Sequence, residues 1–195
     1  RDLAVRIGLA TYFVVVVSIA AGAAVGGEFL VNTFTSSNQS TPSVAALDGG
    51  GFVVTWRSVF QDGSGFGIYG QRYNAAGAAV GAEFQINTFT SGDQVTSSVA
   101  ALDGGGFVVT WNSAGQDGDG QGIYGQRYDA AGAAAGSEFQ VNTFTSGGQH
   151  LPSAVALDGG GFVVTWNSQD QDGSGQGIFG QRYGTRRALG FLTIA

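Results

Sequence analysis

The chain of 195 residues has no cysteine, no methionine and no lysine, and it has a single histidine. Without cysteine it can form neither disulfides nor thiolate metal sites, so its stability must come from packing or from a bound hard cation. Its formal net charge is −6, and its 8 arginines are not clustered as phosphate binding requires. We therefore expect no nucleic-acid partner. The absence of methionine even at position 1 indicates a processed chain or a piece of a longer reading frame.

Catalytic side chains are also scarce. A Ser-His-Asp triad could be drawn only through His150, which occupies a position held by Val95 and Ser40 in other parts of a repeat described below. That variability predicts a surface loop residue. No pair of carboxylates stands out as the pair needed for glycoside hydrolysis. We expect that the protein is not an enzyme.

The most informative feature present is a strict repeat. The segment from Asp48 to Trp56 returns unchanged at Asp103–Trp111 and at Asp158–Trp166, displaced by 55 positions each time. Asp-Gly-Gly-Gly provides residues that tolerate a positive φ, as a tight turn needs, and the β-branched and aromatic run behind it favours a strand. Each copy is therefore predicted to centre on a β-hairpin.

The middle copy predicts four strands in a fixed order. They are Ser98–Leu102, Phe107–Trp111, Gly122–Tyr128 and Ser137–Asn142. The first two are apolar on both faces, whereas the last alternates as an outer strand does. This pattern predicts an all-β fold of tandem four-stranded antiparallel blades, β-propeller-like, with the Phe and Trp of one blade packed on the Ala and Val of the next. The alternative is a linear β-solenoid.

The repeat also sets the expected domain organisation. We expect an atypical segment at 1–19, a repeat domain at 20–183 with copies at about 28–82, 83–137 and 138–183, and an atypical tail at 184–195 in which Phe191–Ile194 could form a fourth strand. Three copies and a remnant do not close a ring easily. We therefore expect further repeats or self-association.

The segment Ile7–Val25 has two interpretations. It is uncharged, follows Arg1 and Arg6 and ends in small residues, which resembles a secretory signal or a membrane span. Alternatively, the run from Ala20 to Gly26 matches the repeat, which would make Tyr12–Ser18 a strand. A membrane is a partner only under the first interpretation.

The recurring motifs are Glu-Phe-Gln-Val-Asn-Thr, Asp-Gly-Gly-Gly-Phe-Val-Val-Thr-Trp, Gln-Asp-Gly-Ser-Gly-x-Gly-Ile and Tyr-Gly-Gln-Arg-Tyr. Over about residues 20–183 they resemble tandem repeats of large secreted bacterial proteins, often found beside haemolysin-type calcium-binding nonapeptides. The resemblance implies a secreted or surface repeat protein without a defined enzymatic activity. The nonapeptide Gly-Gly-x-Gly-x-Asp is itself missing, so its mode of calcium binding is not implied.

Acidic loops between the second and third strands are the candidate metal site. Calcium prefers several oxygen ligands on a flexible backbone, and Asp spaced by Gly can provide them. The candidate ligands are Asp62 in the first loop, Asp117 and Asp119 in the second, and Asp170 and Asp172 in the third. Weak calcium binding is one interpretation, and ordinary turns rich in Asp and Gly are the other.

Three further series recur with the repeat. They are Arg72, Arg127 and Arg182, then Glu28, Glu83 and Glu138, then Trp56, Trp111 and Trp166. The charged series could form a repeated ligand site, but structural ion pairs or Arg-aromatic stacks are more typical. The tryptophans could be platforms for sugars, but at the ends of apolar strands they are expected in the core.

These observations predict a non-enzymatic, secreted or cell-surface repeat module for adhesion or structural spacing, with calcium as a possible cofactor and an extracellular protein or glycan surface as partner. The alternative is a lectin-like propeller that binds carbohydrate in equivalent pockets between blades.

Overall fold

The computed structural model describes residues 22–184. By contact clustering the chain divides into two compact units, Arg1–Leu30 and Val31–Ala195. The described part of the first unit, residues 22–30, contains no strand or helix. All the described strands belong to the second unit.

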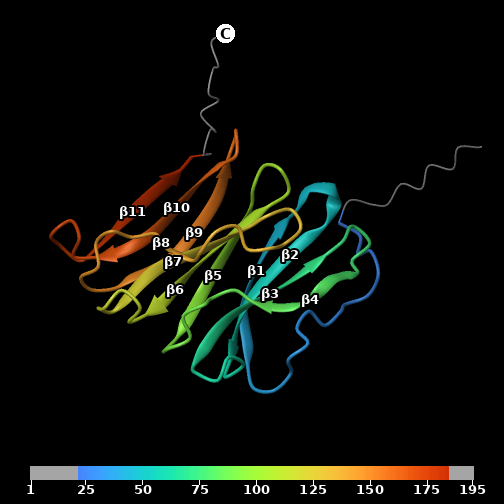
Figure 1. Ribbon diagram of the computed structural model, residues 1–195, viewed down its shortest axis with the longest axis horizontal. Coiled ribbons are helices and arrows are strands. Elements are labelled where there is room, and N and C mark those ends of the chain that lie inside the picture. Colours follow the sequence, from blue (N-terminus) through green and yellow to red (C-terminus); the bar gives the residue numbers. More distant parts are fainter. Residues whose placement is uncertain (1–21, 185–195) are drawn as a thin grey trace, which may run out of the picture. The chain divides into compact units, whose positions relative to one another are not determined.

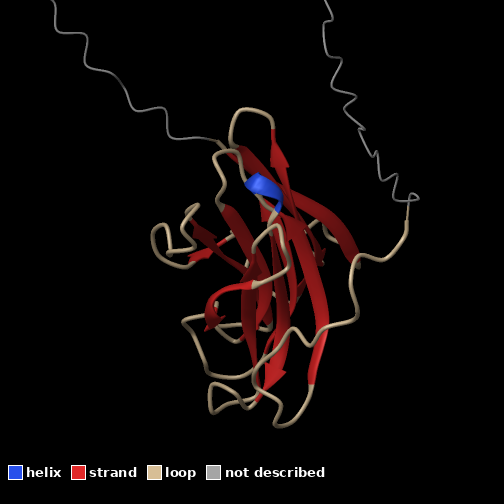
Figure 2. Ribbon diagram, turned by 90° about the vertical axis from the view of Figure 1, so that its right-hand side faces the viewer, coloured by secondary structure: helices blue, strands red, loops and turns tan. Residues whose placement is uncertain are grey.

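The second unit is built from three antiparallel sheets (Figure 1). The first sheet contains β1 (Gln39–Ala46), β2 (Phe52–Val59), β3 (Phe66–Tyr73) and β4 (Ala79–Gln85); the middle sheet contains β5 (Gln94–Ala101), β6 (Phe107–Ala114), β7 (Gln121–Tyr128) and β8 (Phe139–Gln140); the last sheet contains β9 (Gln149–Leu157), β10 (Gly161–Gln169) and β11 (Gln176–Tyr183). The strands of each sheet are neighbours in chain order. Within the described residues, the one helical segment is a 3-10 turn, η1 (Asp48–Gly50), which Figure 2 shows in blue.

This architecture confirms an all-β fold made of repeated antiparallel sheets, of which the first and the middle have the expected four strands. The last sheet has three strands within the described residues, and β8 is shorter than the fourth strand expected at Ser137–Asn142. No sheet closes on itself within the described residues, and the propeller-like arrangement of the blades stays a prediction. The proposed strands Tyr12–Ser18 and Phe191–Ile194 lie outside the described residues. No helix in the described part of the chain is long and apolar enough to cross a membrane.

The Asp-Gly-Gly-Gly segment makes the hairpin between the first two strands of each sheet, as expected. In the middle sheet Leu102 N donates to Gly106 O at 2.7 Å, and Gly104 and Gly105 have φ values of 87° and 84°. A Cβ added to Gly106 would lie 2.5 Å from Tyr128 O, so no larger residue fits there without a shift. The turn sequence is therefore required by local geometry.

The first strand of every sheet contains a bulge. In the middle sheet the register shifts between Val95 and Ser98, and Thr96 has a φ of 56°. Thr41 and Leu151 occupy the same place in the other sheets, with φ values of 52° and 55°. The extra residue bends the strand where it passes its neighbour.

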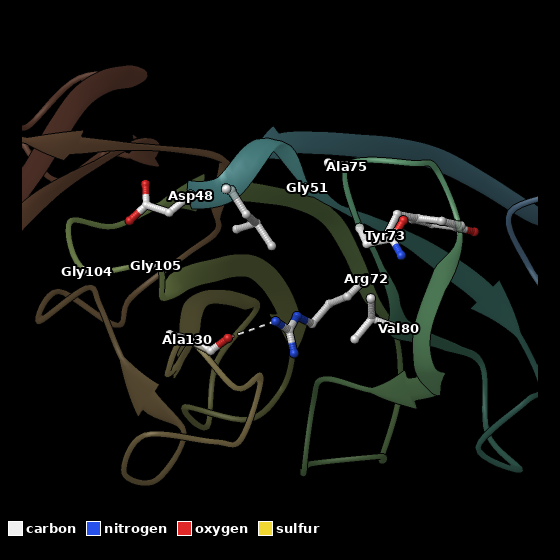
Figure 3. Close-up of a pocket in the computed structure, with 12 residues that line it drawn as sticks. Asp48, Gly51, Arg72, Tyr73, Ala75, Val80, Gly104, Gly105 and Ala130 are labelled. Atoms are coloured by element: carbon white, nitrogen blue, oxygen red, sulfur yellow. Dashed lines mark hydrogen bonds between the residues drawn. The ribbon is translucent and has the colours of Figure 1, made fainter. Parts of the chain in front are cut away.

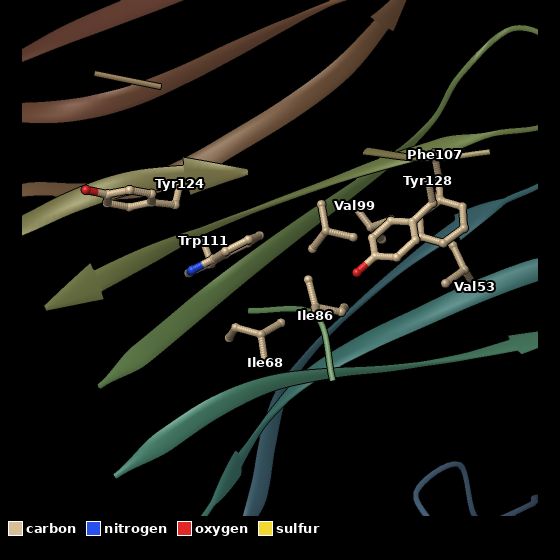
Figure 4. Close-up of a cluster of buried hydrophobic side chains, with 9 residues drawn as sticks. Val53, Ile68, Ile86, Val99, Phe107, Trp111, Tyr124 and Tyr128 are labelled. Carbon is tan, nitrogen blue, oxygen red and sulfur yellow. The ribbon is translucent and has the colours of Figure 1, made fainter. Parts of the chain in front are cut away.

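Aromatic residues of one sheet pack against aliphatic residues of the sheet before it. Figure 4 shows Trp111 and Phe107 of the middle sheet facing Val53 and Ile68 of the first sheet. Phe162 and Trp166 of the last sheet meet Ala100, Val108 and Ile123 of the middle sheet in the same way. Each sheet therefore has an aromatic face turned to the preceding copy and an aliphatic face turned to the following copy. The copies stack as expected, but in the opposite direction, because the aromatic residues meet the preceding copy and not the next one.

Candidate binding site between successive sheets

A cavity of about 360 Å³ lies where the turns of the first sheet approach those of the middle sheet. We call it the first inter-sheet pocket. Asp48 of η1 and Arg72 at the end of β3 line it from the first sheet, and Gly105 and Ala130 line it from turns of the middle sheet (Figure 3). The pocket therefore belongs to the contact between two copies and not to either copy alone.

The same cavity recurs one repeat later. The second inter-sheet pocket has a volume of about 300 Å³ and is lined by Asp103, Arg127 and Gly160, which are the equivalents of Asp48, Arg72 and Gly105. Ala130 and Gly104 line both pockets. Repetition of the interface thus produces repetition of the cavity.

The polar groups of the first pocket are few and balanced in charge. Asp48 supplies one carboxylate and Asn74 one amide, and Arg72 supplies the guanidinium. Arg72 Nη2 donates to Ala130 O at 2.8 Å, and Nη1 donates to Ala131 O. These bonds tie β3 to the next sheet. With the guanidinium engaged, the polar groups that line the pocket are the Asp48 carboxylate, the Asn74 amide and backbone groups of the turns.

The recurrent arginines and glutamates have separate roles. The Arg127 guanidinium lies 5.8 Å from the centre of the Phe162 ring in the next sheet, an Arg-aromatic contact of the expected type. The glutamates bind elsewhere. Glu138 accepts hydrogen bonds from Thr88 N at 2.7 Å, from Thr88 Oγ1 at 3.0 Å and from Gln116 Nε2 at 2.6 Å.

Glu83 makes the same three bonds one repeat earlier, to Thr33 N at 2.6 Å, Thr33 Oγ1 at 2.9 Å and Gln61 Nε2 at 2.5 Å. We call this arrangement the glutamate clamp. It joins the fourth strand of a sheet to the connection before that sheet and to its acidic loop. The glutamates are therefore structural in both complete copies. Glu28, the first of the series, lies in the other unit of the chain.

The acidic loops use their carboxylates to hold their own backbone. Asp62 Oδ1 accepts from Ser64 N at 3.1 Å, and Asp117 Oδ1 accepts from Asp119 N at 3.4 Å. Asp170 Oδ1 accepts from Gly175 N at 2.8 Å and Asp172 Oδ1 from Ser174 N at 3.3 Å. Such bonds are typical of turns rich in Asp and Gly.

Asp119 Oδ2 differs, because it accepts from Gly147 N of the following connection at 3.2 Å. Within residues 22–184 no three His, Cys, Asp or Glu side chains are grouped so that they could hold a metal ion. The two aspartates of one loop thus reach different partners. Calcium binding at these loops stays a prediction.

Two tyrosines lie beside the acidic loops and the glutamate clamps. Burial raises the pKa of Tyr69 to about 12, and the nearby carboxylates of Asp62 and Glu83 add to the effect. Burial raises the pKa of Tyr124 to about 12 in the same way, with Asp117 and Glu138 adding to it. A buried phenol near negative charge loses its proton less readily, so both side chains stay neutral donors at ordinary pH.

The tryptophans are core residues, as expected. Trp56, Trp111 and Trp166 are 3%, 0% and 5% exposed. Their faces are covered by neighbouring side chains, which leaves no platform for a sugar at these positions.

The prediction that His150 is a surface loop residue is wrong. It lies in β9, half-buried, with Nδ1 3.0 Å from Gln121 Oε1 and 3.5 Å from Asn112 Nδ2. The first strand begins before the bulge, so a position with variable side chains is still part of the sheet.

An asparagine-glutamine pair in each connection between copies was missed by the sequence analysis. Asn142 Oδ1 accepts from Ile123 N at 2.7 Å, and Asn142 Nδ2 donates to Phe144 O and to Gln149 Oε1, both at 3.0 Å. Asn87 and Gln94 repeat the arrangement between the first and middle sheets. The fixed spacing of these residues in all three copies was a signal that could have revealed them.

No family model matches the chain, and no curated protein matches it. An endo-arabinase from Bacteroides thetaiotaomicron has a similar fold, with a TM-score of 0.51 and 13% identity over 80% of this chain and 59% of the arabinase. A protein of unknown function from Dyadobacter fermentans gives a TM-score of 0.51 with 10% identity over 74% of this chain and 50% of its own. A fucose lectin from Kordia zhangzhouensis gives 0.40 with 12% identity, covering 71% of this chain and 97% of the lectin. The chain thus spans 59% and 50% of the first two structures, and identities this low indicate similarity of fold alone.

Proposed function

We propose that this chain is a non-enzymatic module, secreted or displayed at a cell surface, that binds saccharides in the two inter-sheet pockets. The observation that carries the proposal is the recurrence of one pocket, with an equivalent aspartate, arginine and turn backbone, one repeat apart. Equivalent sites on a rigid stack suit a repetitive polymer, since engagement of a second site then becomes intramolecular.

The chemistry of the pockets supports a neutral, hydroxyl-rich ligand. Each has carboxylate oxygens that accept from hydroxyl groups and backbone groups that bond in either direction. Leu47 and Val80 add a small apolar surface for the carbon face of a ring in the first pocket. Polyanions are disfavoured by the net charge of −6. The fold also supports the proposal, because it is similar to that of an endo-arabinase.

The test is a glycan array followed by calorimetric titration with the best ligand. Ala130 is exposed and lines both pockets, so Ala130→Phe should obstruct them without disturbing the core. We expect it to weaken binding by about tenfold or more. Ala131→Phe is the matched control, because Ala131 is the next residue of the same turn, is also exposed, and lines neither pocket. Equal binding by both variants and the wild type would exclude these pockets.

A purely structural role as a spacer is the second candidate. It is favoured by the glutamate clamps, which tie the first and the middle sheet each to the connection before it, and by the Arg72 bonds, which tie the first sheet to the middle sheet. A spacer would bind no glycan on the array, with or without millimolar calcium, and would still fold and stack. Running the array in both calcium and chelator also tests whether the acidic loops contribute a cofactor.

A further inference from the structure

The interface between sheets is built twice from equivalent contacts. Val99 N donates to Ser43 Oγ at 3.3 Å between the first and middle sheets, and Ala154 N donates to Ser98 Oγ at 3.1 Å between the middle and last sheets. The apolar clusters repeat as well, with Ile68 in one and Ile123 in the other. The aliphatic half of this interface is also present on the last sheet, where its side chains are exposed.

The last sheet exposes what the other sheets bury. Ile178 is 74% exposed, whereas its equivalents Ile68 and Ile123 are 0% exposed. The edge strand β11 has no described neighbour where β3 pairs with β4 and β7 pairs with β8. A phenylalanine ring lies over Gly70 and over Gly125, but nothing equivalent covers Gly180. Within residues 22–184, the last sheet therefore has neither a fourth strand nor a covering sheet.

The first described residues of the chain carry a sequence equivalent to a fourth strand. Residues 24–32, Ala-Val-Gly-Gly-Glu-Phe-Leu-Val-Asn, repeat the sequence Ala-Val-Gly-Ala-Glu-Phe-Gln-Ile-Asn of residues 79–87, which contains β4. Val44 of the first sheet is 64% exposed, whereas the equivalent Val99 is 7% exposed under the sheet before it. A segment with the sequence of a fourth strand is thus followed by a first strand whose Val44 is exposed.

We propose that the chain associates head to tail, with residues 24–32 of a second copy forming the fourth strand of the last sheet and the first sheet of that copy covering its aliphatic face. The register of β4 on β3 places Val25 of the second copy opposite Arg182 and Leu30 opposite Phe179. Backbone pairing at an open edge supplies affinity, and side chains at fixed register supply specificity.

Polar groups at both ends match under this register. Glu28 of the second copy completes a third glutamate clamp with Thr143 and Gln171. Asn32 Oδ1, to which nothing donates within residues 22–184, accepts from Ile178 N as Asn87 accepts from Ile68 N. Val44 N donates to Ser153 Oγ, as Val99 N donates to Ser43 Oγ. The two ends are therefore complementary in hydrogen bonding as well as in shape.

The position of Val31 indicates that the fourth strand of the last sheet comes from a second copy and not from the same chain. Val31 packs on Trp56 and its neighbours, and Tyr73 Oη donates to Val31 O at 3.1 Å. Val31 is thus anchored to the first sheet of its own chain. The middle sheet lies between that sheet and the last one (Figure 1).

The experiment is a mixing test by light scattering after size-exclusion chromatography over a wide range of concentrations. Wild type should form oligomers that grow with concentration. Ile178→Glu and Val44→Glu each put a charge into one half of the interface, so each should weaken association by about 100-fold or more. An equimolar mixture of the two variants should form a dimer that grows no further, because each retains one intact end.

Phe60→Glu is the matched control. Phe60 is 65% exposed, and its equivalent Gly115 stays exposed in the covered middle sheet. This variant should associate like wild type. Association lost in Ile178→Glu but kept in Val44→Glu would indicate face-to-face pairing and overturn the proposal. A wild type that stays monomeric throughout would overturn it as well. Circular dichroism confirms that each variant is folded.

A cross-link tests the register, since the chain has no cysteine of its own. Val25→Cys mixed with Arg182→Cys should give a disulfide-linked dimer under oxidising conditions. Val25→Cys mixed with Gln181→Cys should not, because adjacent strand residues point to opposite faces. Equal yields from the two mixtures, or none from either, would contradict the pairing. None of these measurements depends on a saccharide, so their failure leaves the proposed function standing.

Discussion

Ile123 of the middle sheet and Ile178 of the last sheet hold the same place in the repeat. Each is preceded by Gly and is followed, after one aromatic residue, by Gly-Gln-Arg-Tyr. The first is fully buried and the second is 74% exposed. The two strands differ only at Tyr124 and Phe179, so the difference in burial comes from what lies next to each sheet. The middle sheet has a neighbour on each face, whereas among the described residues the last sheet has a neighbour on its aromatic face only. Burial in a stacked repeat is therefore a property of position in the stack.

The largest expected effect comes from the centre of the stack. Trp111→Ala should lower the free energy of unfolding by about 3–5 kcal/mol, because it removes a fully buried aromatic side chain from the cluster between two sheets. Urea denaturation measures the change. A midpoint equal to that of wild type would show that the aromatic face is not a core.

Ile123→Ala and Ile178→Ala make the comparison directly. The first should cost about 2–5 kcal/mol, since it leaves a cavity between the middle and last sheets. The second should cost almost nothing in a monomer, because most of the side chain is already in water. Urea melts at low protein concentration separate the two. Similar losses would mean that the face of Ile178 is covered in the monomer.

The connections between sheets provide the next effect. Asn142→Ala removes the acceptor of Ile123 N and two donated bonds, so it should cost about 1–3 kcal/mol. Asn32→Ala should cost less in the monomer, because Asn32 has no equivalent bond from a third strand within the described residues. Thermal melts of both variants against wild type test this difference in stability. A larger loss of stability for Asn32→Ala than for Asn142→Ala would contradict it.

A smaller effect appears at high pH. The pKa of Tyr124 is raised from 10.0 to about 12, and that of Tyr69 likewise, so folding favours the neutral phenol. The stability they contribute is fully present below pH 10 and is lost as the pH rises through 10 towards 12. The last sheet has Phe179 at this place. Tyr69→Phe/Tyr124→Phe should therefore flatten the loss of stability across that range, and an unchanged slope in chemical denaturation would contradict the assignment.

The smallest expected effect is that of calcium. Loops with two aspartates, Asp117/Asp119 and Asp170/Asp172, should bind before the loop with Asp62, with affinities of about 10⁻⁴ to 10⁻³ M. At a calcium concentration equal to the dissociation constant the stabilisation is about 0.4 kcal/mol. The measurement is a thermal melt in millimolar calcium against chelator, repeated on Asp117→Asn/Asp119→Asn. An unchanged melting temperature of the wild type in calcium would show that the loops bind no calcium. An equal shift in wild type and variant would show that calcium binds at another site.

The repeat made much of the fold predictable. Asp-Gly-Gly-Gly before a β-branched run predicted the hairpins, and apolar strand ends predicted the burial of Trp56, Trp111 and Trp166, because both depend on residues close in the chain. The inter-sheet pockets could not be predicted from the sequence in the same way. Asp48 and Gly105 meet only after two copies stack, and nothing local to either turn specifies how closely the sheets approach. His150 was misplaced because the bulge at Leu151 hides the start of a strand from a pattern with period two.

The glutamate clamp has a consequence for the gene. Each clamp joins a threonine to a glutamate 50 residues later, and each serine bond between sheets spans 56 residues, so every such contact lies within about one repeat length. A coding sequence that gains or loses a whole 55-residue unit by recombination therefore keeps all its remaining contacts in register. Insertions of any other length would separate Glu83 from Thr33 or Glu138 from Thr88. Selection on these clamps can thus keep the unit length constant while the number of units remains free to change.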